Sequence, residues 1–298
     1  MSTIQSVIAE SGYIVIDGAM GTVLFAAGLD QGDPPELWNI NHPDRVAAVH
    51  QAYLEAGAQI LLTNTFGGSR FRLALHNAQD RVGQANHAAA LILRKVVDQT
   101  EKAILVAGDI GPSGEVLAPY GELAFQDAKE GFTEQAAALI SGGVDLIWIE
   151  TMSDLEEVRA AVEGTREVSQ DIPIVATMTF DTHGHTMMGV TPEQAFETLS
   201  SFGVVALGGN CGNGPEEIIE VIKKLHAVDS QMTLVAKANA GIPELVKGKA
   251  VYRASPETMA DYAVKSYQAG ARIIGACCGS TPDHVTAISG ALARHTQA

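Results

Sequence analysis

Short apolar runs recur along the chain, and each one ends in polar side chains. The runs are too short for helices and rich in β-branched residues, which is typical of strands buried on both faces. Between them, segments such as 45–56 (RVAAVHQAYLEA) and 84–97 (QANHAAALILRKVV) carry apolar residues at helical spacing. Strand and helix therefore alternate. The predicted strands are YIVID (13–17), QILLTN (59–64), ILVAGD (104–109), DLIWIE (145–150), IPIVATMTF (172–180), VVALGGNC (204–211), TLVAKAN (233–239) and RIIGACC (272–278).

Eight strands that alternate with helices predict an α/β fold, a (β/α)₈ barrel of parallel strands. Helical crossovers cover both faces of such a sheet, and 298 residues is close to the usual length of this barrel. Prolines beside capping residues predict helix starts at Pro192, Pro215, Pro256 and Pro282. An open, doubly wound sheet is the alternative. Since no linker interrupts the alternation, we expect a single domain over residues 1–298.

The charge balance narrows the classes of partner. The chain has 19 lysines and arginines against 35 acids, a net charge of −16, which argues against binding nucleic acid or an anionic membrane. No apolar run approaches the roughly 18 residues of a membrane span, and the N-terminus has no basic start. We expect a cytoplasmic protein whose three cysteines remain thiols.

All three cysteines, Cys211, Cys277 and Cys278, stand at the ends of predicted strands. The C-terminal ends of the strands converge at one mouth of the barrel, where active sites of this fold lie. Three thiolates can hold a tetrahedral zinc ion and leave its fourth position open, as in catalytic zinc sites. Adjacent side chains of a strand point to opposite faces, so Cys277 and Cys278 can share one ion only where the chain turns. The flanking Gly275 and Gly279 permit such a turn. A redox pair and inert buried thiols are the alternatives.

An all-sulfur zinc site favours a particular chemistry. Three thiolates give the site a formal charge of −1, which makes it a weak activator of water. A coordinating thiol nevertheless loses its proton and remains nucleophilic, which suits alkyl transfer to sulfur. A zinc hydrolase that uses Glu150 as its base, and a non-catalytic zinc-binding barrel, are the rival hypotheses.

Motifs spread over nearly the whole chain resemble the homocysteine S-methyltransferase family. That family includes the homocysteine module of cobalamin-dependent methionine synthase and the betaine-homocysteine and S-methylmethionine enzymes. The resemblance implies a zinc-binding (β/α)₈ barrel that methylates homocysteine to methionine, with zinc on Cys211, Cys277 and Cys278. The motifs are DGAMGT (17–22), ELW and NHPDRV with AYLEAGAQILLTNTF (36–66), VAGDIGPSGE (106–115), DLIWIET (145–151), GGNC (208–211), NAG (239–241) and GACCGSTPDHV (275–285).

The same resemblance implies how homocysteine binds. Asp17 and Glu150 would hold its amino group, and the backbone of Gly18, Ala19, Met20 and Gly21 would receive its carboxylate. Carboxylates suit an ammonium, and exposed amides of a glycine turn suit a carboxylate.

Three other polar residues at strand ends each have two possible roles. Asn210 is predicted to contact the substrate or to position Cys211, and Asn239 has the same two interpretations. Asp109 lines the donor entrance or bonds the turn that follows it. His183 and His185 are predicted to lie in an exposed loop rather than in a second metal site.

Differences between members of the family indicate which methyl donor this chain uses. A betaine-type donor needs an aromatic cage, for which Trp38 and Phe66 are the nearby aromatic residues. The segments TNTF and IET look more like the methionine synthase module, whose donor is methylcobalamin. We expect no cobalamin-binding domain in this chain, so methylcobalamin would arrive on a separate corrinoid protein. A small sulfonium or ammonium donor is the alternative.

Overall fold

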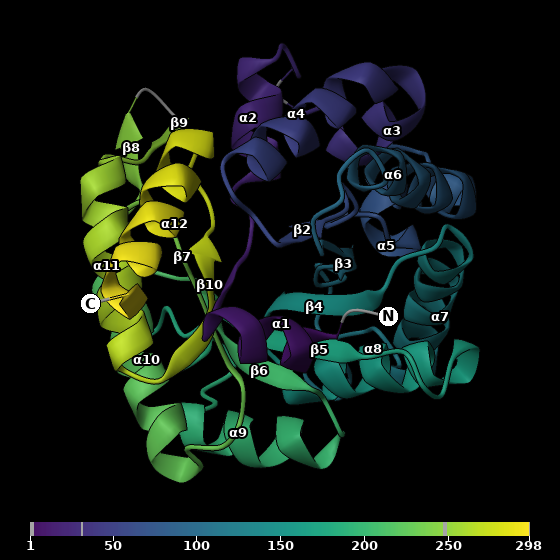
Figure 1. Cartoon of the computed structure of the whole chain (residues 1–298). Helices are drawn as coiled ribbons and strands as arrows, with labels where there is room; N and C mark the ends of the chain where they lie inside the picture. The colour runs from purple at the N-terminus through teal and green to yellow at the C-terminus, as the bar shows by residue number, and fades with distance from the viewer. Residues whose placement is uncertain (1–2, 31, 247–248, 298) are drawn as a thin grey trace.

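Eight parallel strands form the centre of the molecule and close into a barrel (Figure 1). The computed structural model describes residues 3–30, 32–246 and 249–297. The strands pair in the order β1-β10-β7-β6-β5-β4-β3-β2, and a parallel bridge between Ile16 and Ile60 joins the two ends of this order. The predicted barrel is therefore confirmed over the open sheet. The strands are β1 (Ile14–Val15), β2 (Ile60–Leu62), β3 (Leu105–Ile110), β4 (Leu146–Met152), β5 (Ile174–Met178), β6 (Ala206–Cys211), β7 (Leu234–Ala238) and β10 (Ala271–Ala276).

Helices surround the strands, and several begin where the sequence predicted. The hydroxyl of Thr191 accepts from the Gln194 amide in a capping box before Pro192, and Ser255 caps the helix that starts at Pro256. None of the described helices is long and apolar enough to cross a membrane. The helices are α1 (Ile4–Ser11), α2 (Met20–Ala26), α3 (Trp38–Asn41), α4 (Pro43–Glu55), α5 (Arg70–Ala74), α6 (Val82–Val97), α7 (Phe125–Ser141), α8 (Leu155–Val168), α9 (Pro192–Ser201), α10 (Pro215–Val228), α11 (Pro256–Gln268) and α12 (Pro282–Gln297), with short 3₁₀ turns η1 (Pro35–Leu37) and η2 (Gln79–Arg81).

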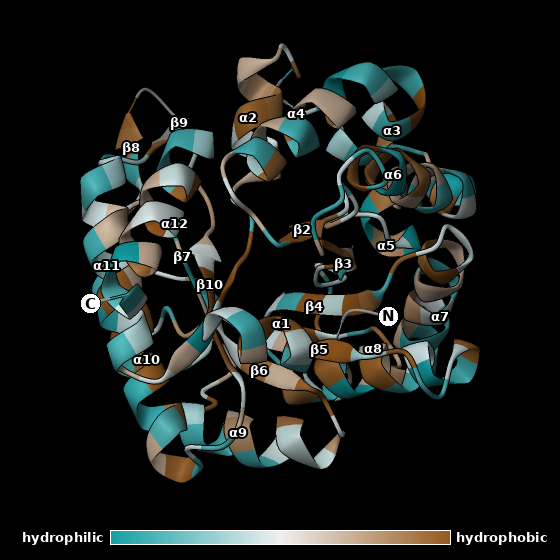
Figure 2. Ribbon diagram, viewed as in Figure 1, coloured by the Kyte–Doolittle hydropathy of each residue, from teal (hydrophilic) through white to brown (hydrophobic). Residues whose placement is uncertain are grey.

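The core has an inner and an outer part, because strand side chains alternate between the barrel interior and the helices. Residues such as Ile14, Leu105 and Trp148 form the inner cluster, and Ile4 and Val7 of α1 pack against it at one end of the barrel (Figure 1). The strand residues that alternate with these inward residues belong to the larger cluster beneath the helices. Figure 2 shows the matching pattern, with apolar strands and polar outward faces on the helices.

Toward the C-terminal ends of the strands, the inward positions become polar. Each is two residues beyond an inward apolar residue or glycine, so alternation points it into the barrel. This layer lies directly above the apolar interior, and its side chains are buried. The layer consists of Asp109, Glu150, Thr177, Asn210 and Lys237.

One element was not predicted from the sequence. Between β7 and α11 the chain forms an antiparallel hairpin of β8 (Glu244–Val246) and β9 (Lys249–Val251). Its first strand is fully exposed, so it lacks the burial pattern that marks the barrel strands.

Candidate metal and substrate site

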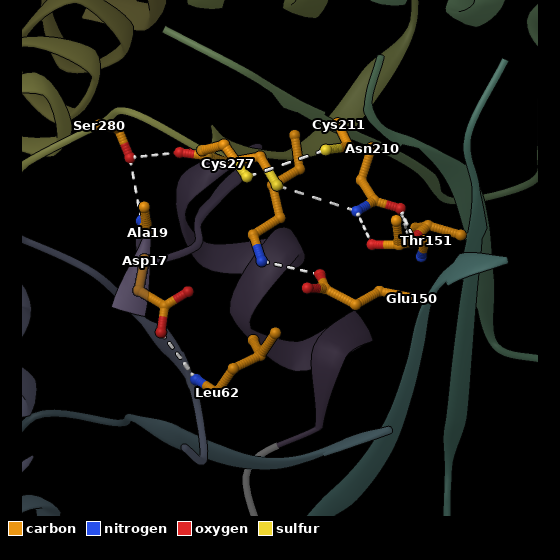
Figure 3. Close-up of polar contacts among 12 residues, drawn as sticks. Asp17, Ala19, Leu62, Glu150, Thr151, Asn210, Cys211, Cys277 and Ser280 are labelled. Carbon is orange, nitrogen blue, oxygen red and sulfur yellow. Dashed lines mark hydrogen bonds and ion pairs between the residues drawn. The ribbon is translucent and has the colours of Figure 1, made fainter. Parts of the chain in front are cut away.

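The three cysteines meet at the mouth of the barrel. Their Sγ atoms all lie within 4.8 Å of one another, and Cys211 Sγ is 3.9 Å from Cys278 Sγ (Figure 3). Cys277 is buried, while Cys211 and Cys278 are half-buried and face the opening. Among the residues that the structure describes, this is the only group of three or more metal-ligating side chains this close together.

The adjacent cysteines converge because β10 ends before them. The strand stops at Ala276, and the Ser280 amide donates to the Cys277 carbonyl at 3.2 Å, so 277–280 form a tight turn. Gly279 has φ +78°, as predicted for a bend, and its Cα lies against the ring of Tyr252. Gly275 is required for another reason: a Cβ there would lie 2.3 Å from Ile16, so the chain directly after β1 excludes a side chain.

Cys211 reaches the cluster through its backbone conformation. It follows the inward Asn210 on β6, so alternation would turn it outward. Its φ of +64° lies in the left-handed region, which L-residues rarely adopt. This rotation points Asn210 and Cys211 to the same mouth.

The geometry of the cluster fits a zinc ion. Four ligands at the Zn–S distance of 2.3 Å from a tetrahedral centre are separated by about 3.8 Å, close to the 3.9 Å between Cys211 and Cys278. The contacts within the cluster favour negative charge on one sulfur: hydrogen bonds from Cys211 and Cys277 lower the pKa of Cys278 to about 3, whereas hydrogen bonds with the other two cysteines raise the pKa of Cys211. Asn239 Oδ1 is buried without a hydrogen-bond partner at the end of β7.

The turn of the cysteines is bonded to the DGAMGT turn after β1. Ser280 Oγ donates to the Cys277 carbonyl at 2.8 Å and accepts from the Ala19 amide at 3.0 Å (Figure 3). The Gly279 amide donates to Thr22 Oγ1 at 3.1 Å. Hydrogen bonds thus join the cysteine turn, near the C-terminus, to the turn near the N-terminus that is predicted to bind the substrate carboxylate.

A buried ion pair lies below the sulfur atoms. Lys237 Nζ is 2.8 Å from Glu150 Oε2, and both side chains are more than nine-tenths buried. Burial acts to lower the pKa of Lys237, but the surrounding acidic groups, Glu150 first, raise it well above its ordinary value. Lys237 is therefore a cation, and it occupies one oxygen of Glu150.

Two further carboxylates in this region lack full partners. The Leu62 amide donates to Asp17 Oδ2 at 2.8 Å, whereas Asp17 Oδ1 is buried without a partner (Figure 3). Asp109 Oδ1 is also buried without one. Burial raises the pKa of Asp17 to about 7 and that of Asp109 well above its usual range. Unpaired buried carboxylates are costly, so this layer suits one more cationic group.

The predicted aromatic and histidine residues lie on segments outside the polar layer. Trp38 is buried and packs against His42 and Arg45, so it does not face a donor. Phe66 is partly exposed beside Gly111. His183 and His185 are exposed, as predicted.

Sequence reasoning missed several members of the site. Tyr252 comes from the segment after the unpredicted hairpin, and its ring lies next to the cysteine turn. Lys237 lies within the predicted strand TLVAKAN (233–239), and alternation along β7 could have identified it as inward. Thr151 belongs to the IET segment that the sequence linked to the donor, but its place in the site depends on an irregularity in β4 that the sequence does not mark.

Comparison with known proteins agrees with a site for a thiol substrate. A family model described as homocysteine S-methyltransferase matches residues 14–292. The chain is 32% identical to methionine synthases of Mycobacterium leprae (strain TN), over 296 residues, and Mycobacterium tuberculosis (strain ATCC 25618 / H37Rv), over 295 residues. Each alignment covers 94% of this chain but 24% of the relative, so the chain spans about a quarter of their length.

Solved structures share the fold. The metallated form of the homocysteine methyltransferase MmuM from Escherichia coli has a TM-score of 0.81 at 25% identity, covering 96% of this chain and 99% of that one. Its oxidized form gives a TM-score of 0.82 at 24% identity, covering 97% and 99%.

Proposed function

The chain belongs to the homocysteine S-methyltransferase family, and on that basis we propose that it transfers a methyl group to the sulfur of homocysteine, forming methionine. The observation that carries the proposal is the pairing of two unlike sites at one barrel mouth. Three sulfur atoms lie within 4.8 Å of one another, above a buried layer that contains unpaired carboxylate oxygens. A substrate with a thiol at one end and an ammonium at the other matches both.

We propose that Cys211, Cys277 and Cys278 hold the zinc ion. Bound there, zinc would lower the pKa of a substrate thiol and leave its sulfur nucleophilic. The spacing of the three sulfur atoms supports this assignment.

The amino acid end of homocysteine is proposed to bind between the DGAMGT turn and β4. Asp17 offers its unpartnered Oδ1 to the ammonium, and Glu150 offers the oxygen that Lys237 leaves. The Ala19 amide already donates to Ser280. The substrate carboxylate therefore depends on the other amides of the turn, those of Gly18, Met20 and Gly21.

The transfer itself needs the substrate sulfur in its deprotonated form. The thiol proton leaves to solvent before transfer; a sulfur lone pair then forms the new S–C bond. The bond between the methyl group and its donor breaks, and its electron pair stays on the donor. The role of this chain is to bind, orient and deprotonate the thiol.

We propose methylcobalamin on a separate corrinoid protein as the donor. The similarity to methionine synthases supports this choice, and so does the burial of Trp38, which removes it from an aromatic cage. Large apolar side chains on three of the connections between strands and helices around the mouth are highly exposed, as a bulky donor surface would require. They are Tyr120 (83% exposed), Met187 (73%) and Leu245 (82%).

The zinc assignment is tested with Cys278→Ser. We expect one zinc per chain in the wild type and its loss in the variant after dialysis against a mild chelator. Gly143→Ala, far from the cysteines on the α7–β4 connection, is the matched control and should keep the metal. A wild-type protein with no stoichiometric zinc would contradict the assignment.

The reaction is tested by methionine formation across a panel of donors. We expect activity with methylcobalamin on a corrinoid protein; glycine betaine, S-methylmethionine and dimethylsulfoniopropionate test the small-donor alternative. Turnover with methyltetrahydrofolate alone would refute both donor classes, and no methionine from any donor would refute the proposed activity.

A further inference from the structure

Glu150 and Thr151 form a bulge near the end of β4. Pairing with β5 is regular from Ile147 to Ile149 and then slips, so that Met152 lies opposite Met178 with one extra residue on β4. Thr151 has φ +62°. A β-branched residue is strained in this left-handed region, so other contacts must hold it there.

The bulge changes which side chains face the barrel interior. Trp148 and Glu150 are inward, so an unbroken strand would turn Thr151 outward and Met152 inward. Met152 instead packs in the outer cluster with Met178. Thr151 Oγ1 bonds to the inward side chain of Asn210. Glu150 and Thr151 therefore face the mouth together (Figure 3).

Asn210, two strands away on β6, holds this conformation. Its Oδ1 accepts from the Thr151 amide at 2.8 Å and from the Thr177 hydroxyl at 2.7 Å. Its Nδ2 donates to Thr151 Oγ1 at 2.7 Å and lies 4.0 Å from Cys277 Sγ. Because a backbone amide can only donate, the contact with Thr151 also fixes the orientation of the Asn210 amide.

These contacts use the full hydrogen-bonding capacity of Asn210. An asparagine side chain has two N–H donors and an oxygen with two lone pairs. Both lone pairs and both donors point at protein atoms, and the side chain is fully buried. Nothing remains for the direct substrate contact that the sequence suggested for this residue.

We propose that Asn210 is a positioning residue, which clamps Thr151 in its left-handed conformation and thereby fixes Glu150 for the substrate ammonium. This inference rests on the proposed function, because it assigns Glu150 to homocysteine. It extends that function by joining the two ends of the substrate: Asn210 contacts Thr151 beside the amine site and Cys277 in the sulfur site. Loss of the clamp would release the bulge and displace Glu150 from Lys237.

The test is homocysteine binding to the zinc-loaded protein by calorimetry, with zinc content measured for every variant. We expect Asn210→Ala to weaken binding by about tenfold, since buried groups left without their hydrogen-bond partner cost a factor of about five to 150. Glycine adopts a positive φ without strain. Adding Thr151→Gly to Asn210→Ala should therefore restore most of the binding. The remaining loss of affinity should be about threefold or less, because glycine removes the backbone strain at position 151.

Thr177→Val is the matched control. It removes one bond to Asn210 Oδ1 but leaves both contacts between Asn210 and Thr151. Its binding should stay within about threefold of the wild type, as expected for one neutral hydrogen bond.

A double variant that binds homocysteine no better than Asn210→Ala, or unchanged binding in Asn210→Ala, would overturn the positioning role. If Asn210→Ala does not fold and the double variant does, the clamp is supported; if neither folds, it is refuted. Failure of the wild type to bind homocysteine would instead refute the proposed function.

Discussion

Replacing Lys237 with methionine tests the electrostatic logic of the barrel interior. The change keeps an unbranched side chain, one atom shorter, but removes the ammonium that pairs with Glu150 at 2.8 Å. Glu150 then lies buried without a cation, close to Asp17 and Asp109. The variant should fold, because Glu150 can take up a proton instead of remaining charged.

Protonation sets an upper limit on the cost. Keeping a carboxyl with an unfolded-state pKa of about 4.3 neutral at pH 7 costs about 1.36 kcal/mol per pH unit, or about 3.7 kcal/mol. The variant also avoids burying the Lys237 ammonium, which offsets part of this cost. We therefore expect a loss of about 2 to 4 kcal/mol in the free energy of unfolding at pH 7.

The pH dependence distinguishes this account from simple loss of packing. In the variant, native Glu150 binds a proton that the unfolded chain releases above pH 4.3, so stability falls as pH rises. In the wild type burial also raises the pKa of Glu150, but the ion pair with Lys237 opposes this shift and favours the ionised carboxylate. The stability gap should widen by up to about 3.4 kcal/mol between pH 5.5 and pH 8, because these are 2.5 units of about 1.36 kcal/mol each.

Urea unfolding of both proteins at pH 5.5, 7 and 8, without metal, measures this gap. Glu150→Gln in the Lys237→Met background is the control: it removes the contribution of Glu150, so any pH dependence that remains in the gap comes from Asp17 and Asp109, whose pKa values Lys237 also lowers. A gap that stays constant from pH 5.5 to 8 in Lys237→Met alone would show that charge burial is not the cause.

Two further variants probe single features of the fold. His50 is buried with neither ring nitrogen hydrogen-bonded, and burial lowers its pKa to about 3; the wild type should therefore lose about 1.4 kcal/mol per pH unit below pH 6.5 from this group. His50→Leu should remove that slope in urea unfolding, and equal acid sensitivity of the two proteins would contradict it. Gly279→Ala should displace Cys278 and raise the zinc dissociation constant about tenfold or more, because a Cβ would meet the Tyr252 ring. Gly143→Ala also has a positive φ but open space, so equal zinc affinities in the two glycine variants would refute this reasoning.

The sequence by itself determined the barrel. Each strand is buried on both faces, and a continuous apolar run in the sequence indicates this. Capping residues such as Thr191 and Ser255 mark where helices begin. The strand ends could therefore be identified, together with the cysteines they carry. The exposed hairpin β8–β9 escaped prediction because no burial pattern marks it.

Only the tertiary structure decided how the side chains at the mouth are used. Local sequence does not show that Thr151 and Cys211 adopt left-handed conformations, since these are stabilised by contacts from other strands. Nor does it show that Lys237 neutralises Glu150, 87 positions away. Hydrophobic periodicity encodes which face of a strand is buried, whereas pairing between polar groups depends on distances that exist only after the barrel closes.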